Sequence, residues 1–273
     1  MDPLFPPFQP NSPDPRGTRF RAIPLRVLIP NVITLIALCA GMSAIRLAIE
    51  GRLELAVGCI VVAALLDGVD GRVARYLKGT SRFGAELDSL ADFVNFGVVP
   101  ALVLYFWGLH DLNSLGWIGS LVFAICMVLR LARFNVMINN PDRPAYQADF
   151  FTGMPAPAGA CTVLLPIYLD FLGLHHERAF APLELAYVFL IAFLMVSTIP
   201  TFSGKKLGTR VPREWVLPVF VVAVALIMLL AFYPWETLTA ITAAYLAAIP
   251  LGVMRYRRLA REHEAAMAVK ATE

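Results

Sequence analysis

Four aspartates stand close together in an otherwise apolar part of the chain, within the stretch DGVDGRVARYLKGTSRFGAELDSLAD that runs from Asp67 to Asp92. Asp67 and Asp70 are three residues apart, and Asp88 and Asp92 are four apart, so each pair shares one face of a helix. Grouped carboxylates favour divalent cations such as Mg²⁺, Mn²⁺ or Ca²⁺, which prefer oxygen ligands. Carboxylates from two helices can hold one or two such ions, an arrangement that assists phosphoryl displacement.

The elements that position these aspartates are predicted to be membrane helices. Hydrophobic residues make up 58% of the 273 residues and charged residues only 16%, whereas soluble domains are about 45–50% apolar. A bilayer core about 30 Å thick needs about 20 apolar residues per helix. We therefore expect an all-α integral membrane protein with about eight transmembrane helices. The candidate segments are 27–49, 54–76, 86–108, 115–137, 153–173, 183–202, 214–233 and 236–254.

The basic residues predict the orientation of these helices. If the N-terminus is cytoplasmic, all but three of the 23 Lys and Arg residues fall in cytoplasmic segments, as the positive-inside rule requires. The exceptions are Arg46, Arg52 and Arg178. Basic loops facing anionic lipid head groups also account for the net charge of +3 without a nucleic-acid partner. Both termini are thus expected to be cytoplasmic.

The chain divides into three parts by composition. Residues 1–26 are proline-rich at the start and are predicted to form a disordered or amphipathic cytoplasmic segment. Residues 27–254 form the expected transmembrane catalytic domain, and residues 255–273 a basic, helical cytoplasmic tail. The last two apolar segments contain no polar constellation, which is compatible with a peripheral position. The four cysteines are isolated within predicted helices, so we expect them to be small apolar packing residues.

The short connection between the second and third segments brings the aspartates together. Consecutive helices joined by a short loop run antiparallel, so all four carboxylates converge near the cytoplasmic side of the bilayer. Ionised carboxylates in that setting cost several kcal/mol each unless a positive charge offsets them. Arg72 and Lys78 are better placed to reach the lipid head groups. A solvated loop is the plainer alternative, but the aspartates fall on shared faces with apolar residues between them.

The stretch also resembles a known signature. Written out, its spaced residues are D-x2-D-G-x2-A-R-x8-G-x3-D-x3-D, which resembles the motif of the CDP-alcohol phosphatidyltransferases. The resemblance implies a membrane enzyme that moves a phosphatidyl group from a CDP-linked lipid to an alcohol and releases CMP. The implied metal ligands are Asp67, Asp70, Asp88 and Asp92, the last also being the implied base. The implied nucleotide-binding positions are Gly71, Ala74, Arg75 and Gly84.

Residues outside the signature narrow the resemblance. Bacterial, membrane-embedded phosphatidylserine synthases contain segments similar to PNVITL, RLARFN, FFTGMPAPAGA and IPTFSGKK. This resemblance implies that the substrates are CDP-diacylglycerol and L-serine and that Mg²⁺ or Mn²⁺ occupies two sites. It also implies a location in a bacterial inner membrane and a homodimer. One departure is Asn95, where a serine is expected. Asn31 and Thr34 are candidates to line the nucleotide pocket, although Asn31 could instead cap the first helix after Pro30.

The alternatives for the function differ mainly in the acceptor alcohol. Serine carries a carboxylate, so a cationic side chain is expected near the metals. Arg133 is the first candidate and Arg130 is the second. The plainer interpretation of each is an arginine whose side chain extends to the membrane–water interface. A related enzyme using glycerol 3-phosphate or another alcohol is the alternative, although a phosphorylated acceptor calls for a denser basic pocket. A cation transporter is a third hypothesis, disfavoured because transport sites usually lie near the midplane between repeats.

Overall fold

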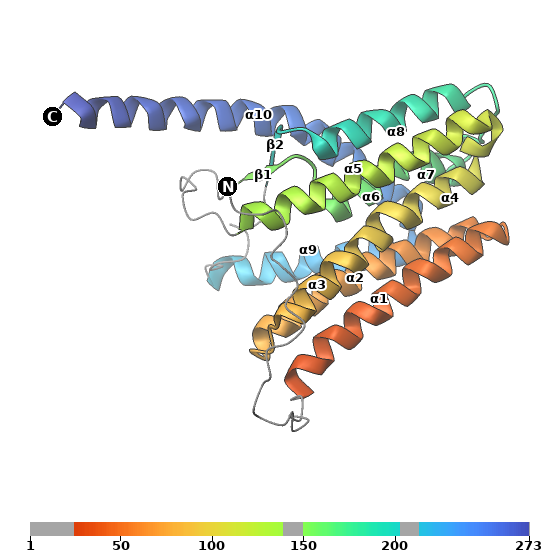
Figure 1. The fold of residues 1–273 in the computed structure, drawn as a ribbon, viewed down its shortest axis with the longest axis horizontal. Coiled ribbons are helices and arrows are strands. Elements are labelled where there is room, and N and C mark those ends of the chain that lie inside the picture. The colour runs from red at the N-terminus through yellow and green to blue at the C-terminus, as the bar shows by residue number, and fades with distance from the viewer. Residues whose placement is uncertain (1–24, 139–149, 203–212, 273) are drawn as a thin grey trace, which may run out of the picture.

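The computed structural model describes residues 25–138, 150–202 and 213–272. Its elements, in chain order, are α1 (Leu25–Ile49), α2 (Leu53–Tyr76), α3 (Arg82–Phe93), the π-helical η1 (Val94–Val98), α4 (Val99–Trp107), the 3₁₀ turn η2 (Leu109–Leu112), α5 (Ser114–Ile138), β1 (Phe150–Thr152), α6 (Ala156–Val163), α7 (Leu165–Phe171), α8 (Ala181–Val196), β2 (Pro200–Phe202), α9 (Arg213–Phe232) and α10 (Pro234–Thr272). Within these ranges the fold is a helical bundle with one short antiparallel strand pair (Figure 1).

The predicted apolar segments are largely helical in the described part of the chain. Five stretches are long and apolar enough to cross a membrane within the described ranges: Leu25–Ile49, Arg82–Trp107, Ser114–Met137, Trp215–Phe232 and Pro234–Tyr256. This confirms a multi-pass, all-α membrane protein. The second predicted segment corresponds to α2, a helix of 24 residues whose final turns carry the charged residues of the signature.

Three segments differ in detail from the expected helices. The fifth is split at Leu164 into α6 and α7, where Pro166 stands in the first turn of the new helix, a position that suits a residue without an amide N–H. The sixth ends at Val196, ahead of β2. The eighth continues past residue 254 to Thr272 without a helix end, so the tail is helical as predicted. Of the predicted N-terminal segment 1–26, only the last two residues lie in the described part of the chain.

Small residues let the helices around the aspartates pack closely. Thr34, Ala37, Gly41, Ala44 and Ala48 recur every three or four residues along α1, and all are buried. Such a stripe allows two membrane helices to approach at backbone distance, and α1 packs along α2, α3 and α4. In contrast, no residue of the apolar stretch in α9 is buried, as suits a helix that is hydrophobic all round and faces lipid.

At the end of the bundle opposite the aspartates, one histidine contacts several helices. His176, in the connection between α7 and α8, places Nδ1 2.9 Å from Glu184 Oε1 and Nε2 3.3 Å from Asp111 Oδ2. Its ring also packs against Trp107 in a tilted arrangement, with 4.8 Å between ring centres, and Trp107 Nε1 donates to Asp170 Oδ2 at 2.7 Å. One imidazole thus connects η2, α4 and α8.

We predict that His176→Ala destabilises the protein. Each of the two hydrogen bonds to a charged group contributes about 1.5–3 kcal/mol, so their loss should lower Tm by at least about 6 °C. Burial lowers the pKa of His176, but Glu184 and Asp111 outweigh it, so the pKa is raised above 6.5. The stabilisation should therefore be complete below pH 6.5 and decline as pH rises through the folded-state pKa.

Thermal unfolding in detergent across this pH range checks the prediction. His175→Ala is the matched control, because His175 is exposed and its ring lies beside the carbonyl of Gly173. Equal effects of the two substitutions at every pH would contradict the assigned role of His176.

Candidate active site

The turn between α2 and α3 aims the signature aspartates at one another. Helix α2 ends in a Schellman motif, in which Gly79 N donates to Ala74 O at 2.9 Å and Lys78 N donates to Arg75 O at 3.2 Å. Lys78 takes the left-handed conformation that this motif needs, with φ of 50°. Ser81 then caps α3 by accepting a hydrogen bond from Gly84 N at 2.9 Å. The chain thereby reverses direction within a few residues.

A proline and a glycine fix this turn against the start of α1. Pro30 lies inside α1 and has no amide N–H to bond the carbonyl of Arg26, four residues earlier. Gly79 occupies the space beside that carbonyl, where an added Cβ would lie only 2.0 Å from Arg26 O. A side chain at position 79 would force the turn away from α1, so glycine is required for this close approach.

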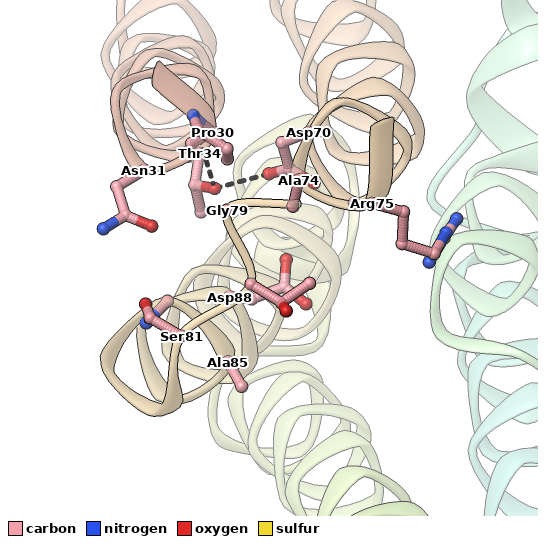
Figure 2. A pocket seen from close by; sticks show the side chains of 13 residues that line it. Pro30, Asn31, Thr34, Asp70, Ala74, Arg75, Gly79, Ser81, Ala85 and Asp88 are labelled. Carbon is pink, nitrogen blue, oxygen red and sulfur yellow. Dashed lines mark hydrogen bonds between the residues drawn. The ribbon is translucent and has the colours of Figure 1, made fainter. Parts of the chain in front are cut away.

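Three of the four aspartates form one cluster. Asp67, Asp70 and Asp88 each offer a carboxylate oxygen, and these oxygens lie within 4.8 Å of one another. Asp70 is 3% exposed, and its Oδ2 accepts a hydrogen bond from Thr34 Oγ1 at 2.5 Å. Figure 2 shows this bond together with the approach of Thr34 to the carbonyl of Pro30. The hydroxyl of Thr34 therefore fixes the direction of one carboxylate.

The fourth aspartate lies beside this cluster. Asp92 is one turn along α3 from Asp88 and interacts with the carboxyl group of Asp67. Its Oδ1 is buried and has no hydrogen-bond partner among the described residues. An orphaned carboxylate oxygen next to three converging carboxylates needs a positive partner. The donor set consists of oxygens alone, so these residues fit a hard divalent cation.

A cavity of about 230 Å³ adjoins the cluster. It brings together Asp70, Asp88 and every nucleotide-binding position expected from the sequence, namely Asn31, Thr34, Gly71, Ala74, Arg75 and Gly84. Asp67 and Asp92 are not part of its lining. Five further lining residues are not predicted by the sequence pattern: Pro30, Gly79, Thr80, Ser81 and Ala85. A serine three residues before Gly84 is a capping signal that could have placed this turn beside the site.

The small residues of the cavity are not equivalent. A Cβ added at Gly84 would lie 2.8 Å from Asn31 Oδ1 and 3.1 Å from Ser81 Oγ, whereas one added at Gly71 would meet nothing closer than Arg75 Nη1 at 3.8 Å. Gly84 is therefore the tighter constraint. The side chain of Arg75 is exposed and is directed away from Asp88 (Figure 2).

The two candidate acceptor arginines have different surroundings. Arg133 Nη1 donates to the carbonyl oxygens of Val196 at 2.6 Å and Ser197 at 3.3 Å, which satisfies the free carbonyls at the end of α8. Arg130 lies over the ring of Phe134, 5.8 Å from its centre, and interacts electrostatically with Asp92. The first-ranked candidate is thus engaged in packing α5 against α8, and the second faces the aspartates.

The sequence of this chain is similar to known protein families. The family model described as CDP-alcohol phosphatidyltransferase matches residues 27–199, and a second, described as CDP-alcohol phosphatidyltransferase 2, matches residues 214–250. The chain belongs to the CDP-alcohol phosphatidyltransferase family.

Individual relatives agree with this family. The chain is 42% identical over 255 residues to a CDP-diacylglycerol–serine O-phosphatidyltransferase of Mycobacterium leprae, covering 90% of this chain and 80% of the relative. It is 35% identical over 233 residues to the protein of the same name in Helicobacter pylori, covering 84% and 91%. An archaetidylserine synthase of Methanothermobacter thermautotrophicus is 31% identical over 190 residues, covering 67% and 74%.

We predict that Asp70→Asn weakens Mn²⁺ binding by about tenfold or more, or about 1.4 kcal/mol. The substitution removes one of three converging negative charges but preserves the shape of the side chain. Titration of the purified protein with Mn²⁺, followed by electron paramagnetic resonance, measures the affinity. Glu86→Gln is the control, because Glu86 is an exposed residue of α3. Equal affinities of the two variants would rule out Asp70 as a ligand.

A second prediction concerns the cavity. Gly84→Ala should weaken binding of CDP by about tenfold, because the new methyl group meets Asn31 and Ser81, and overpacking of this kind costs about 1–3 kcal/mol. Gly68→Ala is the control, since a Cβ at Gly68 would meet nothing within 4 Å. Calorimetric titration with CDP compares the variants. An affinity unchanged in Gly84→Ala would show that the nucleotide does not use this wall.

Proposed function

We propose that this protein transfers the phosphatidyl group of CDP-diacylglycerol to the hydroxyl of L-serine, giving phosphatidylserine and CMP. The observation that carries the proposal is the convergence of Asp67, Asp70 and Asp88 beside a cavity walled by small residues. Relatives named for this reaction, similar over 84–90% of the chain, support the choice of donor and acceptor.

The proposed metal site consists of Asp67, Asp70, Asp88 and Asp92, holding two Mg²⁺ or Mn²⁺ ions. Such ions, when bound, offset the charge of the carboxylates and of the diphosphate, and they stabilise the charge on the departing CMP. The three grouped carboxylate oxygens and the orphaned Oδ1 of Asp92 support this assignment. Thr34 contributes by orienting Asp70.

The cavity is proposed to hold the cytidine end of the donor. Gly71, Ala74 and Gly84 present little side-chain bulk, so the base and ribose can approach the backbone of α2 and α3. Asn31 and the turn around Ser81 supply polar groups on the opposite wall. Arg75 has a long, exposed side chain, and a change of rotamer would bring its guanidinium to a phosphate of the donor. The acyl chains remain in the lipid.

Asp92 is proposed as the general base. The serine hydroxyl loses its proton to a carboxylate oxygen of Asp92 as the serine oxygen forms a bond to the phosphorus that bears diacylglycerol. The bond from that phosphorus to the oxygen of the CMP phosphate breaks, and its electron pair leaves with CMP. General-base assistance of this kind is worth about 10²–10⁴ in rate. The position of Asp92 beside Asp67, away from the cavity lining, supports a role toward the acceptor.

An arginine is proposed to bind the serine carboxylate. Arg130 is the better supported of the two candidates, because it interacts with Asp92, whereas Arg133 donates to carbonyls at the end of α8. On this view Arg133 acts indirectly, by holding the acceptor side of the bundle together.

The proposed setting is a bacterial inner membrane, with both termini cytoplasmic and the acidic site near the inner leaflet. The distribution of basic residues supports this orientation. A homodimer is proposed from the family resemblance.

Transfer of labelled acceptors by the purified protein, with CDP-diacylglycerol and Mn²⁺ or Mg²⁺, tests the proposed function. Labelled serine should enter lipid with release of an equal amount of CMP. Incorporation of glycerol 3-phosphate without serine would instead favour a related phosphatidyltransferase. Cation flux in liposomes with no release of CMP would favour a transporter.

We predict that Asp92→Asn lowers kcat by about 10²–10⁴ but retains CDP binding. The amide preserves size and cannot accept the proton. Single-turnover rates and CDP titration measure the two quantities, with Glu54→Gln, in the first turn of α2, as the control. A variant that keeps wild-type kcat would remove Asp92 from the role of base.

A further inference from the structure

A tyrosine of the last helix lies close to the proposed acceptor side of the site. Tyr245 belongs to α10, far along the chain from the signature, and its hydroxyl oxygen is buried without a hydrogen-bond partner among the described residues. A buried hydroxyl left unpaired costs about 1–3 kcal/mol, and such groups in native proteins usually have a partner. The partner of this hydroxyl is therefore to be sought in a ligand.

The neighbours of the hydroxyl suggest the chemistry of that ligand. The guanidinium of Arg130 interacts electrostatically with both Tyr245 and Asp92. The other polar neighbour, Thr201, also interacts with the hydroxyl of Tyr245. Thr201 lies outside hydrogen-bonding geometry with that hydroxyl, and it donates its own hydroxyl to Gly153 O at 2.7 Å. Within the described residues, Tyr245 thus offers a hydroxyl without an acceptor, and Arg130 offers a guanidinium that interacts with the proposed base.

The fold brings these residues together from four separate elements. Strand β2, which contains Thr201, pairs with β1 and packs against α10. The side chain of Arg130, on α5, lies over Phe134, and Asp92 is on α3. Figure 1 shows α10 running past β2 beside the bundle. The last helix therefore contributes to the site through β2, although its sequence contains no polar cluster.

Building on the proposed function, we infer that Tyr245 is a specificity-determining residue of the acceptor site, where its hydroxyl and the guanidinium of Arg130 bind the carboxylate of an amino-acid alcohol whose hydroxyl faces Asp92. A planar guanidinium can donate two parallel hydrogen bonds to a carboxylate, and the phenol supplies a further donor. One cation with one neutral donor balances a single negative charge. A phosphomonoester dianion would leave a charge unpaired beside the carboxylate of Asp92.

Steady-state kinetics of Tyr245→Phe test this inference. The KM for L-serine should rise about tenfold, the loss expected for one hydrogen bond to a charged group, with kcat and the KM for CDP-diacylglycerol nearly unchanged. Tyr233→Phe is the control, because Tyr233 is 58% exposed. An unchanged KM for serine, or a fall in kcat alone, would overturn the inference.

A double-mutant cycle with Arg130→Lys provides a second measurement. If both side chains bind one carboxylate, their effects on the KM for serine should be less than additive, because either substitution already disrupts the shared contact. Strict additivity would contradict a shared ligand. A wild-type protein that makes no phosphatidylserine would defeat the proposed function as well, whereas normal wild-type synthesis with an unaffected Tyr245→Phe would defeat this inference alone.

Discussion

The arrangement of this protein depends on the cost of placing several carboxylates among apolar helices. Carboxylate oxygens of Asp67, Asp70 and Asp88 lie within 4.8 Å of one another, and Asp92 adds an oxygen that has no hydrogen-bond partner in the described part of the chain. Mutual repulsion and poor solvation would separate such groups unless a cation bound between them. The features around the cluster resist that separation, since Thr34 donates a hydrogen bond to Asp70 and the close approach of Gly79 to the carbonyl of Arg26 holds the turn against α1.

This electrostatic requirement connects the fold to the chemistry of the family. Carboxylates held at fixed positions can bind divalent ions, and such ions can in turn attract a diphosphate carried by a lipid. The cavity beside them is narrow where Gly84 approaches Asn31, so it suits a flat base and sugar better than an acyl chain. In the proposed reaction, the lipid part of the donor would stay in the membrane while its polar part reaches the aspartates.

Sequence patterns predicted most of what lies close together along the chain. The apolar segments and the facing aspartate pairs follow from composition and spacing along the chain. The small residues of the cavity follow from the resemblance to the family motif. Contacts between distant segments could not be predicted in this way. Position along the chain favours Arg133 over Arg130, because Arg133 lies at the cytoplasmic end of the predicted fourth helix. Only the packing of α5 on α8 shows that Arg133 donates to Val196 O. Likewise, Tyr245 reads as one aromatic residue in an apolar helix until α10 is packed against β2.

The most direct test of the central claim is the anomalous scattering of Mn²⁺ in crystals grown with that ion and CDP. The account predicts anomalous peaks in contact with the carboxylate oxygens of Asp67, Asp70 and Asp88, with the diphosphate on the opposite side of the metal. Carboxylates that turn apart into water, with no anomalous peak between them, would contradict it.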